Sequence, residues 1–247
     1  MNPIATQTIG EIAARSMAAV RIFEEHGIDY CCGGQRSLDE VCREKGIDAD
    51  ALVAETEAAG EAGQESEKDW SSAPLKELID HIVEAHHGYL RREFPHLGRR
   101  LASVLQAHGK LHGDTLGPLA NVFGSLRAEL EMHMRKEEMI LFPFIARAEQ
   151  SSLAGLPWTP PPFGTVGNPI EVMEHEHDSA GRALEQMRRL TNQYTLPEDA
   201  CNTYRALYEG LAALERDLHV HIHLENNVLF PRAIAMERPD TGAKPRP

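Results

Sequence analysis

The chain has few of the features that mark secreted, membrane-embedded or nucleic-acid-binding proteins. Only 4 of its 247 residues are cysteine, too few for a disulfide framework at this length. Basic residues number 25 against 38 acidic ones, giving a formal net charge of −13. Nucleic acids and anionic membranes are bound through basic side chains, so this balance argues against both partners. The chain opens with no signal-peptide pattern, and no apolar run approaches the roughly 18 residues of a membrane span. We expect a cytoplasmic protein.

Strand signals are also scarce, whereas helical periodicity extends along the chain. Near the start, Thr8 with Glu11 and Ser37 with Glu40 form capping-box patterns, and Gly27 is placed to end a helix. Three short helices are predicted in this part. Longer helical patterns follow over residues 74–108, 118–149 and 169–193, and from Thr195, which forms a capping box with Glu198, to 237.

These patterns predict an all-α chain with a small N-terminal helical domain and an up-down four-helix bundle. A polar segment rich in glycine and serine separates the two parts, and a proline-rich segment forms the one long connection within the bundle. The predicted boundaries are 1–60 for the N-terminal domain, 61–73 for the linker, 74–237 for the bundle and 238–247 for a disordered tail.

The bundle sequence contains an internal duplication. His133 and Glu137 are followed by Leu-Phe-Pro, and His221 and Glu225 are followed by the same three residues at the same spacing. At nearly the same offset, Glu84-Ala-His-His and Glu174-His-Glu-His recur, which aligns His87 with His177. A bundle built from two such copies is expected to have an approximate two-fold axis.

The duplication selects a set of metal-binding side chains. Residues four apart lie on one helical face, so each His-x3-Glu pair presents an imidazole beside a carboxylate. With one histidine from each of the other two helices, four imidazoles and two carboxylates face the core: His87, His133, Glu137, His177, His221 and Glu225. Such a set can hold two ions with the carboxylates bridging. Nitrogen and oxygen donors without thiolate favour iron or manganese over structural zinc.

A competing set and several further histidines stay open. Glu84 and Glu174 stand three residues before His87 and His177, and Glu-x2-His is the ligand motif of ferritin-like bundles. His219 and His223 form an i, i+4 pair, but the duplication gives them no counterparts and helical geometry points them away from His221. His86, His108 and His175 have no assigned role.

The cysteines divide into two kinds. Cys42 and Cys201 fit small buried hydrophobes on helical faces. Cys31 and Cys32 stand in a glycine-rich turn, which we expect to be exposed, and the helix that begins near Ser37 is placed to lower a thiolate pKa. This pair is predicted to serve redox chemistry, metal transfer or docking.

The chain resembles the iron–sulfur cluster repair di-iron protein family over nearly its whole length. The resemblance rests on five motifs: Asp29-Tyr30-Cys31-Cys32-Gly33-Gly34, Glu67-Lys68-Asp69-Trp70, His133-x3-Glu137-Glu138, Glu176-His177-Asp178 and His221-x3-Glu225-Asn226-Asn227. It implies an N-terminal cysteine domain joined to a hemerythrin-like bundle with a non-haem di-iron centre. In that centre the four histidines are terminal ligands, and Glu137 and Glu225 bridge the irons.

The resemblance also implies a cytoplasmic homodimer that repairs clusters damaged by oxidative or nitrosative stress. Its partners would be damaged iron–sulfur proteins or a cluster-assembly scaffold. Iron donation fits this better than conventional enzyme activity. The alternatives are a hemerythrin-like sensor that binds O2 or nitric oxide, and a di-iron protein that reduces nitric oxide.

Overall fold

The structure, a computed structural model, describes residues 7–62 and 68–237. Part of the predicted linker, residues 63–67, and the predicted tail lie outside the described residues. Within the described ranges the chain is helical without a β-strand, so the predicted all-α class is confirmed; Thr8 and Ser37 form one isolated bridge. No helix in these ranges has the length and apolar character needed to cross a membrane.

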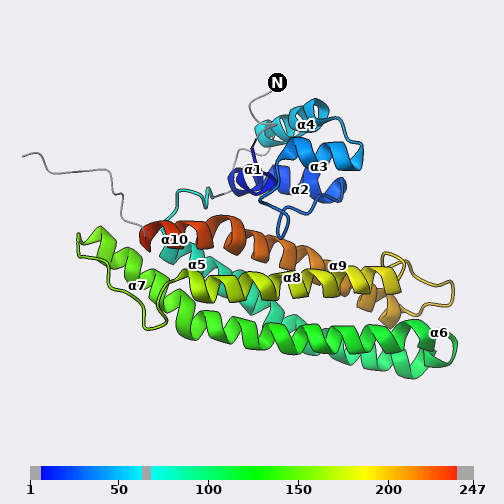
Figure 1. The fold of residues 1–247 in the computed structure, drawn as a ribbon. Helices are drawn as coiled ribbons and strands as arrows, with labels where there is room; N and C mark the ends of the chain where they lie inside the picture. The colour runs from blue at the N-terminus through cyan, green and yellow to red at the C-terminus, as the bar shows by residue number, and fades with distance from the viewer. Residues whose placement is uncertain (1–6, 63–67, 238–247) are drawn as a thin grey trace, which may run out of the picture. The chain divides into compact units, whose positions relative to one another are not determined.

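The helices are labelled in Figure 1, and π-helical turns between them are labelled η here. In chain order they are α1 (Ile9–Arg15), α2 (Met17–Glu25), α3 (Leu38–Lys45), α4 (Ala49–Ala62), α5 (Leu75–His81), η1 (Ile82–His87), α6 (Gly88–Lys136), η2 (Glu137–Leu141), α7 (Phe142–Leu153), α8 (Gly167–Leu190), α9 (Asn202–His223), η3 (Leu224–Leu229) and α10 (Phe230–Glu237). The chain forms two compact units. The first comprises Met1–Asp80, Pro143–Ile170 and His219–Pro247, and the second comprises His81–Phe142 and Glu171–Leu218.

The second unit has the up-down order of a four-helix bundle. Helix α6 runs out and back, reversing at His112, whose φ of −119° and ψ of 21° are not helical (Figure 1). The helix predicted to begin at Pro118 therefore begins directly after this turn, with Pro118 inside it. Helix α8 lies antiparallel to the returning arm, since His133 bonds Glu176 at 2.9 Å and Ser179 bonds Glu129 at 3.3 Å.

Helix α9 lies antiparallel to the outgoing arm of α6. The order of contacts shows this: residues of η1 and α6 that rise in number meet residues of α9 that fall, in the pairs His86–Asp217, Leu97–Gly210 and His108–Tyr204. At the middle contact the backbones approach closely, because a Cβ on Gly210 would stand 2.7 Å from a methyl carbon of Leu97.

A stripe of apolar residues at helical spacing fills the interior of this bundle. Along α6 the buried members are Leu90, Phe94, Leu97, Leu101, Val104, Leu116, Leu119, Phe123, Leu126 and Leu130. Each fully buried leucine or phenylalanine contributes about 1.5–3 kcal/mol relative to an exposed one. The same spacing that carries this stripe brings His133 and Glu137 to the interior.

The predicted start of the fourth helix is wrong. Thr195 does not cap a helix, because residues 195–201 form a loop and α9 begins at Asn202. Three residues in succession, Asn192, Gln193 and Tyr194, adopt left-handed φ values of 48°, 58° and 57°. The hydroxyl of Tyr194 donates to the buried Glu215 at 2.9 Å, and this anchor holds the loop in place of another helical turn.

In the first unit, α1 to α4 pack together. The Thr8 capping box is present, the Ser37 hydroxyl accepts the Glu40 N–H, and Gly27 follows α2 with a φ of 61°. The first predicted helix is in fact two, because Ser16 is extended and its side chain caps α2. Four helices therefore stand where three were predicted.

Other contacts of the first unit fix the residues that follow position 67. Arg232 donates to the Trp70 carbonyl at 2.9 Å, and the carboxylate of Glu149 accepts the N–H groups of Leu75 and Lys76 at the start of α5. The proline-rich connection between α7 and α8 lies against Phe144 through Trp158 and Phe163. Segment 68–74 is thus bound to the helices that follow it.

Three π-helical turns mark the motifs of the duplication. Residue His87 ends η1, Glu137 begins η2, and Glu225 lies in η3. After η2 and η3 the helices continue through Pro143 and Pro231. A proline lacks the N–H of a regular helical turn, and a wider turn before it accommodates this loss. Such widened turns are frequent at functional sites.

Candidate metal centre

Four of the predicted metal ligands, all in the second unit, lie buried together. These are His87, His133, Glu137 and His177, each no more than 1% exposed. The two oxygens of Glu137 reach different histidines: Oε2 lies 3.4 Å from Nε2 of His87, and Oε1 lies 3.3 Å from Nε2 of His133. The Nε2 atoms of His133 and His177 lie 3.1 Å apart. A carboxylate that faces one histidine with each oxygen is placed to bridge two ions.

Two further carboxylates form hydrogen bonds with the Nδ1 atoms of His87 and His133 and so orient these rings. Glu138 accepts from Nδ1 of His87 at 2.6 Å and also pairs with Arg91. Glu176 lies 2.9 Å from Nδ1 of His133 and pairs with Lys136. The hydrogen bond with His133 lowers the pKa of Glu176 to about 2. With Nδ1 held in this way, Nε2 of each ring is left to bind a metal.

The sequence prediction did not assign a role to Glu138 or Glu176. Both stand directly beside a predicted ligand, Glu138 after Glu137 and Glu176 before His177. That adjacency is the signal that was available: a carboxylate next to a ligand points away from the ion and toward a neighbouring helix.

The first unit carries the other two predicted residues, His221 near the end of α9 and Glu225 in η3. Both are buried, and Nε2 of His221 lies 3.0 Å from Oε1 of Glu225. The predicted pairing of an imidazole with a carboxylate four residues later is therefore present here, as it is for His133 and Glu137.

Within the second unit, donor atoms of His133, Glu137 and His177 lie within 4.8 Å of one another, as do those of His87 and Glu137. Within the first unit, donor atoms of His221 and Glu225 lie within the same distance. Imidazoles and carboxylates without thiolate are donors that suit iron or manganese. The buried donors of each unit therefore fit a metal site.

The competing ferritin-like set is not assembled. Glu84 and Glu174 are exposed, whereas Glu137 and Glu225 are buried.

The remaining histidines near the motifs have other contacts. In the first unit, the rings of His219 and His223 pack edge-on against Tyr30, and Asn227 Nδ2 lies 3.0 Å from Nδ1 of His223. Burial lowers the pKa of His223 to about 4. In the second unit, His86 bonds Asp217 at 2.9 Å, whereas His175 is exposed.

The cysteines differ from the prediction in three respects. Cys31 is buried, not exposed, and Cys201 is exposed, not buried. The pKa of Cys31 is raised well above its ordinary value, because the hydrogen bond to Cys32, burial and Asp29 all favour the thiol. Helix α3 does not overcome these effects.

The cysteine turn is nevertheless a small donor group of its own. Asp29 Oδ1 accepts the N–H groups of Cys31 and Cys32 at 3.1 and 2.9 Å and lies 3.3 Å from the Cys31 sulfur. Asp29, Cys31 and Cys32 offer donor atoms within 4.8 Å of one another. Asn226 and Asn227, which follow Glu225, donate to the carbonyls of Cys31 and Tyr30 at 3.2 and 3.0 Å. The turn is thus held against the residues next to a predicted ligand.

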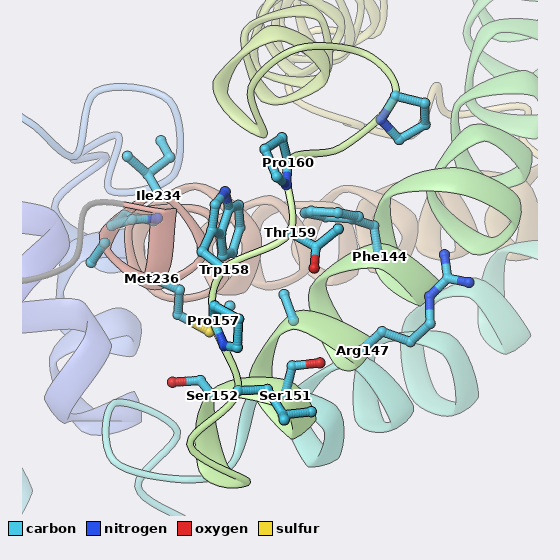
Figure 2. Close-up of a pocket in the computed structure, with 15 residues that line it drawn as sticks. Phe144, Arg147, Ser151, Ser152, Pro157, Trp158, Thr159, Pro160, Ile234 and Met236 are labelled. Carbon is cyan, nitrogen blue, oxygen red and sulfur yellow. The ribbon is translucent and has the colours of Figure 1, made fainter.

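A separate cleft in the first unit does not compete for the metal. It has a volume of about 1000 Å³ and is lined by residues of α7, the proline-rich connection and α10, among them Phe144, Trp158 and Met236 (Figure 2). Its lining contains no histidine, cysteine or carboxylate. It therefore lacks the donors that a metal site needs.

Comparison with known proteins supports a cation-binding site in this chain. Residues 78–233 match the family described as "Hemerythrin HHE cation binding domain", and residues 5–60 match the ScdA_N family, described as a domain of unknown function. The helical bundle and its buried histidines and carboxylates are those of a hemerythrin-type cation-binding protein.

Relatives that match over nearly their whole length define the family more closely than the domain matches do. The iron–sulfur cluster repair protein YtfE of Escherichia coli O1:K1 and that of Escherichia fergusonii are each 42% identical over 231 residues, covering 94% of this chain and 98% of the relative. The Citrobacter koseri protein of the same name is 41% identical over the same shares. The chain belongs to the family of these iron–sulfur cluster repair proteins, as the resemblance of its motifs implied.

Proposed function

We propose that this chain is a di-iron protein that repairs iron–sulfur clusters damaged by oxidative or nitrosative stress, and that it does so by donating iron. The observation that carries the proposal is the position of Glu137, whose two oxygens face Nε2 of His87 and Nε2 of His133. A carboxylate shared in this way is the arrangement that a two-ion centre requires. The names of the relatives support the repair of clusters as the process served.

In this proposal His87, His133, His177 and His221 are terminal ligands, and Glu137 and Glu225 are bridges. Iron bound there is cargo for a damaged cluster. The chain's own residues hold and orient the donors: Glu138 and Glu176 fix the tautomers of His87 and His133, so that Nε2 faces inward. Arg91 pairs with Glu138 and Lys136 pairs with Glu176, which keeps both carboxylates ionised and fixed in position.

The double variant Glu137→Leu/Glu225→Leu tests the ligand set. It removes both proposed bridging carboxylates, and we expect iron content to fall to near zero, with loss of cluster repair. The matched control is Glu84→Leu/Glu174→Leu, which removes the competing ferritin-like carboxylates and is expected to keep full iron content. Near-full iron in the first variant, or its loss only in the control, contradicts the assignment. Metal analysis with Mössbauer spectroscopy gives the identity and number of the ions.

Cys31 and Cys32 are proposed to serve transfer or docking and not iron loading. Support comes from their position, since Asn226 and Asn227 tie the cysteine turn to η3. As the pKa of Cys31 is raised, its sulfur is a resting thiol, and a metal that binds there must displace the proton.

The variant Cys31→Ala/Cys32→Ala tests this role. Iron content and spectra are expected to match those of the wild type, while recovery of a [4Fe–4S] enzyme damaged by nitric oxide fails. Equal recovery with both proteins removes the cysteines from the process. A lower melting temperature of the variant with normal recovery assigns them to packing alone.

The proposal extends to compartment and partners. All four cysteines are thiols and not half-cystines, as expected in a reducing cytoplasm. Damaged iron–sulfur proteins or an assembly scaffold are the proposed recipients, nitric oxide a proposed ligand, and the homodimer the proposed assembly. Light scattering of the eluted protein measures the mass: a value of twice 27.4 kDa is expected, and a monomer at all concentrations overturns the dimer.

A further inference from the structure

Two consecutive asparagines of η3 hold the cysteine turn of the first unit. The amide of Asn226 donates to the Cys31 carbonyl at 3.2 Å. The amide of Asn227 donates to the Tyr30 carbonyl at 3.0 Å and reaches the Cys31 carbonyl at 3.5 Å. The two side chains form an asparagine clamp on the backbone of the turn. Because these bonds start from η3, the position of η3 decides whether the turn stays docked.

The clamp is tightly packed as well as hydrogen-bonded. A Cβ on Gly10 or on Gly34 would overlap the amide oxygen of Asn227. The ring of Tyr30 packs edge-on against that of His223 with 5.5 Å between centroids, and Nδ1 of His223 lies 3.0 Å from the Asn227 amide nitrogen. Since Asn227 is enclosed on these sides, a shift of η3 either moves the turn with it or breaks the bonds of the clamp.

The same short helix carries a proposed iron ligand. Glu225 directly precedes the clamp, is fully buried, and lies 3.0 Å from Nε2 of His221. A buried carboxylate is costly unless its charge is compensated. With iron bound by Glu225 and His221, that charge is compensated and η3 gains bonds that the metal-free protein lacks. Loading with iron therefore stabilises the helical turn from which the clamp extends.

Docking of the turn shields one of its two thiols. Cys31 is 6% exposed, whereas Cys32 is partly exposed. The hydrogen bond to Cys32 and burial raise the pKa of Cys31, and a buried thiol of this kind is unreactive. Opening of the clamp removes the burial, so the sulfur becomes accessible and easier to ionise.

We propose that the asparagine clamp couples the iron content of the protein to the accessibility of Cys31. The inference rests on the proposed function, since it takes His221 and Glu225 to be iron ligands. With iron bound, η3 is fixed and the thiol is withheld. Without iron the docked turn remains the more populated form, but it opens more often. The empty protein thereby presents Cys31 as a donor to an incoming metal ion, and the loaded protein does not.

The test measures how fast each thiol of the full-length protein reacts with iodoacetamide without oxygen, in the iron-loaded and the chelator-treated form. Peptide mass spectrometry separates the four cysteines. Cys31 is expected to react about tenfold faster in the iron-free form, the effect of losing contacts equal to one or two ordinary hydrogen bonds. The exposed Cys201 and the buried Cys42 of α3 are internal references and are expected to react equally in both forms.

The variant Asn226→Ala/Asn227→Ala removes the clamp and keeps every proposed iron ligand. It is expected to bind iron as the wild type does, with Cys31 reacting fast whether iron is present or not. Asn168→Ala is the matched control, because the amide of Asn168 also donates to a backbone carbonyl of the first unit, that of Phe163 at 2.9 Å. This control is expected to keep the dependence of the Cys31 rate on iron.

Three results overturn the coupling while the iron centre stands. One is an equal Cys31 rate in the iron-loaded and iron-free wild type. Another is shielding by iron that persists in Asn226→Ala/Asn227→Ala, which shows that iron protects the sulfur by another route. The third is a Cys42 rate that rises together with that of Cys31, which assigns the change to loosening of all the N-terminal helices. Metal analysis before alkylation separates these results from failure of the proposed function, in which the wild type holds no iron and both proposals fall.

Discussion

The contact of Asn227 with the N-terminal helices makes a sharp prediction about stability. Gly10 in α1 and Gly34 after the cysteine turn both stand against the side chain of Asn227: a Cβ on either would overlap its amide oxygen, and on Gly10 would lie 2.7 Å from Cγ. In Gly10→Ala the new methyl group must therefore displace this amide. The amide donates to the Tyr30 carbonyl at 3.0 Å and lies 3.0 Å from His223 Nδ1.

The magnitude follows from opposing effects. Replacing a helical glycine with alanine stabilises by about 0.5–1 kcal/mol. Losing the two hydrogen bonds costs about 1 kcal/mol each. Gly10→Ala is therefore expected to lower the free energy of unfolding by about 1–1.5 kcal/mol. In an Asn227→Ala background the overlap is gone, and the nearest remaining neighbour of the new Cβ is the Gly34 carbonyl oxygen at 3.0 Å. There the same change should be neutral or stabilise slightly, so the coupling energy of the double variant is about 2 kcal/mol.

Urea unfolding of the metal-free protein, followed by circular dichroism, measures all four members of this cycle. Absence of metal keeps binding energy out of the comparison. The matched control is Gly124→Ala, an exposed position of α6 where a Cβ meets nothing within 4 Å; it should stabilise by about 0.5–1 kcal/mol in both backgrounds. Additive effects of Gly10→Ala and Asn227→Ala, with a coupling near zero, refute the reasoning.

Three further outcomes are expected. Gly210→Leu should lower the free energy of unfolding by about 1–3 kcal/mol, because a Cβ there already meets the buried Leu97 at 2.7 Å; unchanged urea midpoints would contradict the close approach of α6 and α9. Removal of iron by a chelator should lower the melting temperature by about 10 °C, from the roughly 4 kcal/mol that a ligand at a thousand times its Kd supplies, and Glu137→Leu/Glu225→Leu should show no such difference on calorimetry. A chain that starts at Glu67 should fold and bind iron, since all six proposed ligands lie beyond that point, but with lower stability than the full chain because it loses the contacts of Asn226 and Asn227; an unfolded or iron-free product would show that the N-terminal helices are needed.

The burial of the proposed metal ligands was predictable because it follows from local helical geometry. The separation of His133 from Glu137 by one helical turn places both on one face whatever surrounds the helix. The repetition of this pair as His221 and Glu225, with Leu-Phe-Pro after each, separates these residues from the exposed His175. The capping box at Thr8 was predictable for the same reason, since its hydrogen bonds join residues three apart.

The features that prediction missed depend on residues distant in the chain. Helix α9 starts at Asn202 because Tyr194 bonds Glu215, a partner in the next helix. Cys31 is buried because the turn folds against η3 nearly two hundred residues later. No local pattern reports either partner.

The sequence by itself determined the all-α class, the duplicated motifs and the six buried donors, because helical spacing converts residue order directly into a shared face. Only the tertiary structure decided which residues support and surround those donors. Glu138 and Glu176 orient histidines on other helices, and Asp199 in a loop meets His112 at the turn of α6. The physical reason is that a hydrogen bond between helices depends on their packing and register, which follow from the whole set of buried side chains and not from any short segment.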